Sequence, residues 1–132
     1  MRITKVGLCL MRGRSLLLAR SQGDAHFQIP GGKVEEGEND VQALVREIQE
    51  ELGVRADPDT AELIETFVAP AAGRPDMMVE VRLYHCDIEG EPQPSSEIAE
   101  LHWQDVTEDL VPSSDVVRLH IIPHLASAFA SR

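Results

Sequence analysis

Three glutamates that are close together in the chain, Glu47, Glu50 and Glu51, are the residues best suited to chemistry. On a helix, the spacings i, i+3 and i+4 place all three side chains on one face. Clustered carboxylates near a helix C-terminus repel one another and also face the negative end of the helix dipole. A hard divalent cation such as Mg²⁺ or Mn²⁺, which prefers oxygen ligands, would relieve this repulsion. The alternative interpretation is a solvated acidic face on a surface helix.

A pair of glycines lies upstream of the acidic triplet and extends the possible site. Gly31 and Gly32 allow the backbone to come close to the helix and to a ligand, and the Gly31 carbonyl could add a metal ligand. An ordinary turn after Pro30 is the alternative. Glu38 and Arg46 could pair across the junction of loop and helix, or they could form an incidental surface ion pair.

The helix that must carry the glutamates has clear ends in the sequence. Asn39 is a plausible N-cap, with Gln42 three residues later to complete a capping box. Gly53 follows the helix in the position that favours a left-handed backbone. Its apolar positions follow the helical period, and the carboxylates are expected to be turned well away from them. These apolar positions are Val41, Leu44, Val45, Ile48 and Leu52.

Apolar runs on both sides of this helix predict strands. A hairpin is expected from strands at 3–11 and 15–20 around a turn at 12–14, followed by a short extended segment at 25–29. Further strands are expected at 61–69, 77–88 and 97–103, separated by loops that include 32–38 and 70–75. A last helix is expected from 112–115 to about Ala130, with a kink at Pro123. Strands before and after a helix, with a closing helix, imply a mixed sheet with helices on its faces.

The acidic segment and its flanking residues together resemble the Nudix box of the MutT-like hydrolases, here at residues 32–54. The pattern is Gly, five residues, Glu, seven residues, Arg-Glu, an aliphatic, any residue, Glu-Glu, any residue, Gly and an aliphatic. It is matched by Gly32, Glu38, Arg46, Glu47, Ile48, Glu50, Glu51, Gly53 and Val54. The resemblance implies an α/β (α+β) fold, a Nudix-type α/β/α sandwich with a mixed β-sheet. It also implies that residues 1–132 form a single Nudix hydrolase domain.

The resemblance implies metal-dependent cleavage of a nucleoside diphosphate linked to another moiety, with Mg²⁺ as cofactor and Mn²⁺ as a substitute. The implied metal ligands are Gly31, Glu47, Glu50, Glu51 and Glu97, and the implied catalytic residues are Glu47, Glu50 and Glu97. Glu47 is the nearest match to a general base. Glu97, which lies six residues before Trp103, could share or take that role. Glu100 competes with Glu97, and both acids could instead be rim charges.

Four residues are candidates for contacts with the substrate. Arg20 and Lys33 resemble the phosphate-binding cations of MutT-like enzymes, although either could be a solvated surface charge. Phe27 could stack on a base, or it could belong to the core. Asp115, beside Ser114, could accept hydrogen bonds from a purine edge. The alternative for this pair, which we favour, is a cap at the N-terminus of the last helix.

The resemblance implies a (d)NTP pyrophosphohydrolase of MutT type. The amide side chain that reads oxidised guanine in the best-known relative is absent near residues 112–115. Pro70 lies near a proline that is typical of ADP-ribose-cleaving relatives, so an ADP-ribose or nucleotide-sugar pyrophosphatase is the alternative. A non-catalytic Nudix ligand-binding module is a third hypothesis.

Composition limits the partners and the location of the protein. The 132 residues carry a net charge of −11, which argues against polymeric nucleic acid but not against a small nucleotide delivered with a cation. Cys9 and Cys86 are expected to be buried free thiols. The N-terminal apolar stretch is too short and too charged for a signal peptide, and no run approaches membrane-spanning length. A cytoplasmic monomer or homodimer without membrane contact is expected.

Overall fold

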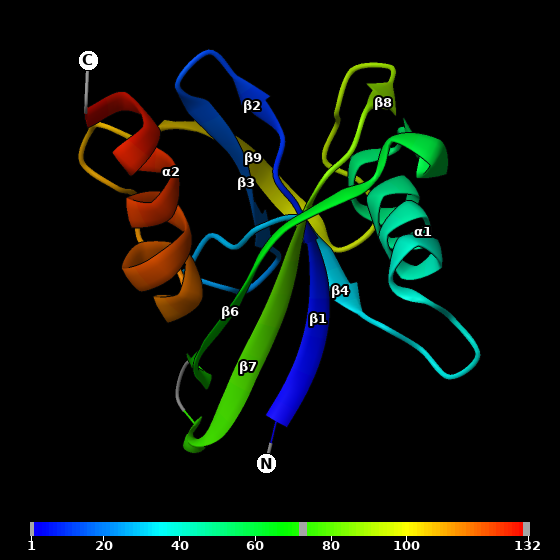
Figure 1. Cartoon of the computed structure of the whole chain (residues 1–132), viewed down its shortest axis with the longest axis horizontal. Coiled ribbons are helices and arrows are strands. Elements are labelled where there is room, and N and C mark those ends of the chain that lie inside the picture. The colour runs from blue at the N-terminus through cyan, green and yellow to red at the C-terminus, as the bar shows by residue number, and fades with distance from the viewer. Residues whose placement is uncertain (1, 72–73, 131–132) are drawn as a thin grey trace.

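The computed structural model describes residues 2–71 and 74–130. Its strands and helices confirm the mixed α/β class expected from the sequence. In chain order they are β1 (Arg2–Leu8), β2 (Met11–Arg12), β3 (Ser15–Ser21), β4 (Gly31–Lys33), α1 (Asp40–Leu52), β5 (Arg55–Ala56), a 3₁₀ turn (Pro58–Thr60), β6 (Glu62–Ala71), β7 (Arg74–His85), β8 (Ile88–Glu89), β9 (Ile98–Asp105), a π-helical turn (Val117–Ile121) and α2 (Ile122–Ala130). Figure 1 shows α1 and α2 on opposite sides of the strands.

The largest sheet is mixed and has the strand order β4-β1-β7-β6. Its central strands β1 and β7 are parallel, whereas β4 and β6 pair antiparallel at the two edges. A second sheet, β2-β3-β9, is antiparallel, and β5 and β8 form a small third one. The Gly31–Lys33 strand pairs with the middle of β1, and this pairing brings the end of β4 close to α1.

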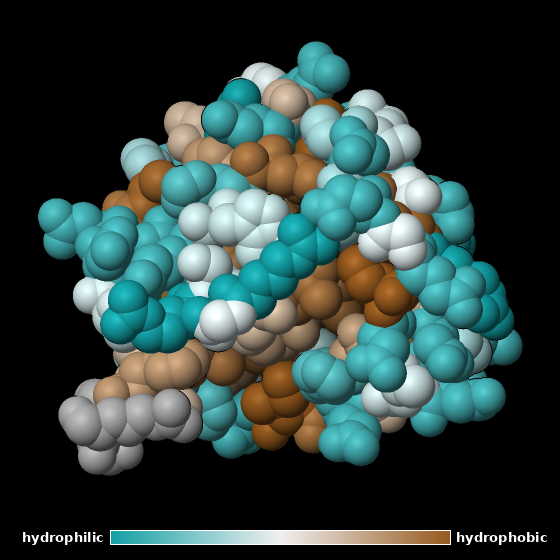
Figure 2. Space-filling view, turned by 90° about the horizontal axis from the view of Figure 1, so that it is seen from above, coloured by the Kyte–Doolittle hydropathy of each residue, from teal (hydrophilic) through white to brown (hydrophobic). Residues whose placement is uncertain are grey.

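Two hydrophobic clusters fill the space between the strands and the two helices. The cluster under α1 contains Leu44 and Leu52, and the cluster under α2 contains Ile121. Strand β3 contributes to both clusters, because Leu17 belongs to the first whereas its neighbours on either side belong to the second. Side chains alternate between the two faces of a strand, so β3 is buried on both sides. The face seen in Figure 2 is mostly hydrophilic, with hydrophobic side chains in separated patches.

Helix α1 has the ends that the sequence predicts. The Asn39 side chain accepts a hydrogen bond from the Gln42 backbone, and the Gln42 side chain accepts one from the Asn39 backbone. Gly53 has the left-handed φ of 66° and donates its N–H to the Gln49 carbonyl. The expected apolar face is buried at Leu44, Ile48 and Leu52, but Val41 and Val45 are only half-buried and Ala43 is buried instead.

The expectation that all three glutamates point well away from the core is wrong for one of them. Glu51 is buried, with a relative exposure of 9%, whereas the side chain of Glu50 is 54% exposed. Glu47 lies between these extremes. The reason is tertiary: strand β4 crosses this end of α1 and covers the side chain of Glu51.

Three strand predictions need correction. The expected strand at 3–11 ends at Leu8, and β2 begins at Met11 in the other sheet, because the chain leaves one sheet for the other between them. The expected loop at 32–38 begins with strand residues of β4. Pro70 lies in β6 and not in a loop, which is tolerated because β6 is an edge strand and needs fewer backbone donors.

The last helix begins at Asp115 and contains the irregularity expected near Pro123. The π-helical turn precedes the proline, and the Ile122 N–H donates to the Val117 carbonyl. Proline has no N–H to continue the regular pattern, which accounts for a disturbance at this place. The expected cap by Ser114 or Asp115 is absent from the described structure: the Ser114 hydroxyl has no hydrogen-bond partner and the turn has no side-chain cap.

Cys9 and Cys86 are both buried and unpaired, as expected from the sequence. Within residues 2–71 and 74–130, no helix is long and apolar enough to span a membrane.

Candidate active site

Three of the predicted carboxylates come together at a cavity of about 350 Å³ beside α1. Glu47 and Glu51 reach it from α1, and Glu97 reaches it from the residue before β9. Glu50 does not line this cavity, because its exposed side chain turns toward Arg46, with 3.7 Å between charged atoms. The cavity, called the acidic cavity below, therefore joins residues that are 50 positions apart in the chain.

Glu51 is the most enclosed carboxylate of the group. Its Oε1 accepts the Gly31 N–H at 2.9 Å. Burial, and after it the charges of Glu47 and Glu97, raise the pKa of Glu51 to about 7. The Gly31 N–H and the charge of Lys5 act in the opposite direction. Glu51 is thus a buried acid with two other acids nearby, which is the electrostatic setting that a bound cation relieves.

The two glycines of β4 allow the close approach that the sequence suggested. Gly31 has a φ of 146°, and a side chain there would collide with the Val6 carbonyl oxygen. A Cβ on Gly32 would lie 2.5 Å from the carboxyl carbon of Glu47, much closer than real Cβ contacts. Gly31 is therefore restricted to glycine by the backbone of β1, whereas a side chain at Gly32 would force the Glu47 carboxylate to move.

Arg46 and Glu38 form the pair expected at the junction of loop and helix. The Arg46 Nε and Nη2 donate to the two carboxylate oxygens of Glu38 at 2.7 and 2.9 Å. Arg46 also donates to Glu47 at 2.8 Å and to the Lys33 carbonyl at 3.1 Å. These hydrogen bonds, with one from the Glu35 backbone, lower the pKa of Glu38 to about 2. One guanidinium thus fixes the loop, β4 and a site carboxylate to the middle of α1.

The loop between β8 and β9 positions Glu97 by binding to the C-terminal end of α1. The Gln93 N–H donates to the Leu52 carbonyl and the Ser95 N–H donates to the Glu51 carbonyl, each at 3.0 Å. Carbonyls in the last turn of a helix have no partners within the helix, so the loop supplies them. The chain then enters β9 with Glu97 on the wall of the acidic cavity.

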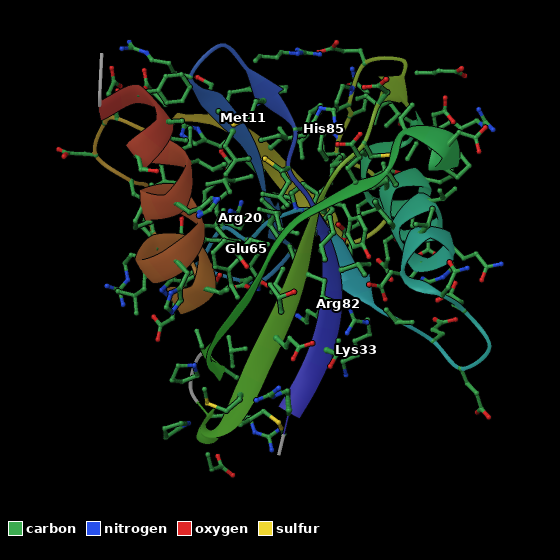
Figure 3. All side chains as sticks on the ribbon, viewed as in Figure 1. Met11, Arg20, Lys33, Glu65, Arg82 and His85 are labelled. Atoms are coloured by element: carbon green, nitrogen blue, oxygen red, sulfur yellow. The ribbon has the colours of Figure 1, made fainter. Side chains whose placement is uncertain are left out.

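Glu100, the competitor of Glu97, has a different environment. It faces Arg20 across the β3–β9 ladder, and the Arg20 Nε donates to its carboxylate at 3.1 Å. Arg20 Nη1 also donates to the Asp24 carbonyl at 3.0 Å. Arg20, expected to bind phosphate, therefore has protein partners, and neither it nor Glu100 lines the acidic cavity. In Figure 3, Arg20 lies toward α2, whereas Lys33 lies at the β4 side of the sheet.

The residues of the acidic cavity suit a divalent metal ion in their chemistry. In the described part of the chain, no group of three His, Cys, Asp or Glu side chains is already arranged as a metal site. Glu47 is held by Arg46 and Glu51 by the Gly31 N–H, and these contacts account for the open arrangement. The donors are all oxygens, and the buried acid among them is short of positive charge. Oxygen donors with excess negative charge are what Mg²⁺ and Mn²⁺ prefer.

A second cavity, of about 370 Å³, adjoins the first on the sheet side and is called the apolar cavity below. Its walls are mostly apolar and come from β1, β6 and β7, with a few polar groups. The lining residues include Ile3, Val79, Val81, Pro70, Val116, Asp24, Gln28, Ser114 and Asp115. The Ser114 hydroxyl is buried without a partner, and Asp115 pairs with Arg118 at 3.0 Å. Apolar walls with a few polar groups are typical of a small-molecule site.

The two cavities share one wall, and that wall contains a cation that sequence reasoning missed. Lys5, Gln28, Ile29, Gly31 and Gly32 line both cavities. Lys5 lies in the middle of β1, where its neighbours are apolar or small. A single lysine inside such a run was the available signal, but its position between two cavities depends on the pairing of β1 with β4 and β7.

The other predicted substrate contacts have mixed outcomes. Lys33 lines the acidic cavity, and Asp115 lines the apolar one. Phe27, considered as a base-stacking residue, instead belongs to the core, because it is 7% exposed and its ring lies 5.7 Å from that of His102. Phe27 lines neither cavity.

The chain is similar to known proteins in both sequence and structure. The family model described as NUDIX domain matches residues 1–125. Among curated proteins, the 8-oxo-dGTP diphosphatase of Escherichia coli (strain K12) is 42% identical over 53 residues, which are 37% of this chain and 41% of that protein. The match therefore spans less than half of that relative.

Two solved structures have the same fold over nearly the whole chain. The MutT NUDIX hydrolase from Burkholderia pseudomallei matches with a TM-score of 0.75 at 22% identity, covering 96% of this chain and 97% of that one. The E. coli ORF135 protein matches with a TM-score of 0.70 at 27% identity, covering 99% of this chain and 93% of that one.

Proposed function

This chain belongs to the NUDIX domain family, and from that premise we propose that it is a metal-dependent hydrolase of a diphosphate linkage in a nucleoside diphosphate derivative. One observation carries the proposal: the acidic cavity and the apolar cavity share a wall. A nucleoside in the apolar cavity would place its attached diphosphate across Glu47, Glu51 and Glu97. A volume of about 370 Å³ lies in the usual range for small-ligand sites.

We assign the holding of a divalent cation, Mg²⁺ or Mn²⁺, to Glu47, Glu50, Glu51, Glu97 and the Gly31 carbonyl. When bound, the cation neutralises charge on the diphosphate and makes water a better nucleophile. Gly31 and Gly32 allow the substrate to come close to the acids, and Arg46 orients Glu47 through its 2.8 Å hydrogen bond. Exposed Glu50 would have to turn from Arg46 to join the other carboxylates.

Two carboxylates are candidates for the general base that accepts a proton from the attacking water. Burial raises the pKa of Glu47, whereas the hydrogen bond that Glu47 accepts from Arg46 lowers it. Within the described residues, the Glu97 carboxylate accepts no hydrogen bond, and it lines the same cavity. We therefore give Glu97 the base role and Glu47 the role of a ligand.

The specific activity that we propose is that of a (d)NTP pyrophosphohydrolase of MutT type, which releases a nucleoside monophosphate and pyrophosphate. The support comes from the 8-oxo-dGTP diphosphatase of E. coli, which is 42% identical over its matched part. Asp115 and Ser114 line the apolar cavity, and we assign them contacts with the base.

Pro70 favours a second candidate substrate class, ADP-ribose or a nucleotide sugar. It lies on the wall of the apolar cavity, at the end of β6, and not in a distant loop. A larger substrate of this class would release a nucleoside monophosphate and a sugar phosphate. A ligand-binding module without catalysis is the third candidate, which turnover would exclude.

A screen of diphosphate compounds with product analysis tests the proposal. The purified chain is supplied with Mg²⁺ or Mn²⁺ and with (d)NTPs, oxidised dNTPs, ADP-ribose and nucleotide sugars, and products are separated by ion-exchange chromatography. Monophosphate with pyrophosphate supports the MutT type, and monophosphate with sugar phosphate supports the alternative. No turnover of any compound with either metal would contradict the proposal that the chain is a hydrolase.

A further inference from the structure

Two lysines face each other across the antiparallel pair of β1 and β4. Lys5 and Lys33 are direct partners in the register, so their side chains leave the sheet on the same face. Like charges at directly opposite positions destabilise a sheet. In the described structure, no acidic side chain forms an ion pair with either lysine. Without a ligand, the two like charges therefore reduce the stability of the fold. Such a pair becomes favourable when an anion lies between the two ammonium groups.

Lys5 is the member of this pair that is best placed between the cavities. It is half-buried and lines both cavities, whereas Lys33 is exposed and lines only the acidic one. The Lys5 side chain makes no hydrogen bond or ion pair with residues 2–71 or 74–130, apart from a longer-range attraction to Glu51.

The other cations near the cavities are already engaged. Arg20 donates to Glu100 and to the Asp24 carbonyl. Arg46 donates to Glu38 and Glu47. Lys5 and Lys33 are the only basic side chains among the described residues that line the two cavities, and neither ammonium group donates a hydrogen bond to the described protein.

Apart from Lys33, the charged side chains on both sides of Lys5 are acidic. Glu47, Glu51 and Glu97 lie in the acidic cavity, and Asp24 and Asp115 lie in the apolar one. A phosphate that passes from one cavity to the other meets repulsion from both directions. A cation on the shared wall lowers the energy of a phosphate at that point.

We propose that Lys5 binds the phosphate attached to the nucleoside, at the shared wall, with Lys33 contacting the phosphate chain from the opposite strand. The proposal rests on the proposed function for the identity of the substrate. Lys5 would then select phosphorylated nucleosides over free ones. An ammonium group forms a much stronger hydrogen bond with a charged phosphate than with an uncharged sugar hydroxyl.

Equilibrium binding separates this role from catalysis. Isothermal titration calorimetry in EDTA would measure the affinity of the four common deoxynucleoside monophosphates and of the matching nucleosides. K5M is expected to weaken monophosphate binding about tenfold, the size of one charge-assisted hydrogen bond at a partly solvated site. Nucleoside affinity should stay the same, and K5R should recover monophosphate binding to within about threefold.

A matched control comes from the same strand. R2M removes a positive charge from β1 outside both cavities, where Arg2 pairs with Glu80 at 2.9 Å, so it tests for an effect of net charge alone. It should leave both affinities unchanged. Equal weakening by K5M of monophosphate and nucleoside, equal effects of K5M and R2M, or no monophosphate binding by the unaltered protein would contradict the proposal.

Kinetics provide a second readout that distinguishes the two proposals. With a substrate found in the screen, K5M should raise KM more than it lowers kcat, because the contact exists before and during the reaction. If the screen finds no substrate, the proposed function fails, but calorimetry still decides whether Lys5 binds phosphate. If turnover is found and K5M changes neither KM nor monophosphate affinity, the Lys5 proposal fails alone.

Discussion

Glu51 shows how one side chain can be costly for the fold and useful for the site. Its carboxylate is buried, has one backbone donor, and is affected more by the charges of Glu47 and Glu97 than by that of Lys5. Burial without a paired cation disfavours the ionised form of an acid. The burial of Glu51 does not help to stabilise the fold. It is explained by a ligand that brings positive charge to the site.

E51Q tests this role with little change of shape. Glutamine can still accept the Gly31 N–H, so the variant should fold, and unfolding in urea should show no loss of stability. Turnover should fall at least about 100-fold, the upper part of the range for groups that support a metal site. E62Q is the control, because Glu62 is exposed on β6 and lies outside both cavities. Unchanged turnover by E51Q would remove Glu51 from the site.

G32A tests the contact between β4 and the helix. Its Cβ would lie 2.5 Å from the carboxyl carbon of Glu47, so this carboxylate must move. Steady-state kinetics should show a fall in kcat of roughly 10²-fold, typical of a misplaced catalytic group. G13A is a useful contrast: Gly13 has a φ of 59° and open space around it. It should lose about 1 kcal/mol of stability and keep its turnover.

If G32A and G13A had the same effect on kcat, Glu47 would not need its present position. Thermal melts of both variants would separate loss of folded protein from loss of activity. The two glycines therefore distinguish a steric need at the site from a conformational need in a turn.

At the scale of elements, the position of α1 depends on contacts with the mixed sheet as well as on its own caps. Arg82 of β7 donates from Nε and Nη2 to the carboxylate of Asp40, the first residue of the helix. The Tyr84 hydroxyl donates to the same carboxylate at 2.8 Å. These hydrogen bonds hold the N-terminal end of α1 on the strand that is central to the sheet.

The Asp40 contacts predict a dependence of stability on pH. The hydrogen bonds from Arg82, and then that from Tyr84, lower the pKa of Asp40 from its ordinary value of 3.8, although burial opposes them. A lowered folded-state pKa gives stability that is present above the unfolded-state pKa and is lost as pH falls through the folded-state value.

D40N should therefore reduce the free energy of unfolding by about 1 to 3 kcal/mol near neutral pH. The difference from the unaltered protein should shrink as the pH falls below about 4. Urea unfolding at a series of pH values would measure it. D76N, at an exposed position of β7, is the control and should show no such trend. A difference that stays constant with pH would contradict the role of the Asp40 charge.

The ends of α1 were predictable because the signals for them are local. Asn39, Gln42 and Gly53 act within one turn of the helix, so their roles can be read from neighbouring residues. The switch of the chain between sheets after Leu8 was not predictable, because it depends on which strand pairs with which. Glu51 illustrates the same limit within the site: its spacing is visible in the sequence, but its burial depends on β4.

Three further site features depend on tertiary contacts that the sequence does not show. Lys5 looks like a lysine in an apolar strand until β1, β4 and β7 are assembled. Phe27 was ambiguous between stacking and core, and packing against His102 decided it. Ser114 and Asp115 resemble a cap in the sequence, but the described structure leaves the Ser114 hydroxyl without a partner.

At the scale of the whole molecule, the net charge of −11 means that a bound cation is expected to increase the stability of the folded protein. A cation that binds only the folded state stabilises it by about 2.7 kcal/mol when present at 100 times its dissociation constant. Adding Mg²⁺ should therefore raise Tm, as measured by differential scanning calorimetry.

Salt at equal ionic strength separates binding from screening of surface acids. Potassium chloride should raise Tm less than Mg²⁺ does, because screening acts on exposed charges and little on buried ones. The excess due to Mg²⁺ should disappear in E51Q. Equal effects of the two salts on Tm would show that the free protein binds no metal. The metal would then have to arrive with the substrate.

The loop before β9 has a consequence for protein engineering. Gln93 and Ser95 donate hydrogen bonds to the last carbonyls of α1. In a chimera, this loop and the end of the helix must therefore be exchanged together. A chimera that takes the loop from another family member of different length would leave helix carbonyls without donors and shift Glu97. Libraries aimed at new substrates should therefore recombine the helix end and this loop together, and place their diversity in the walls of the apolar cavity.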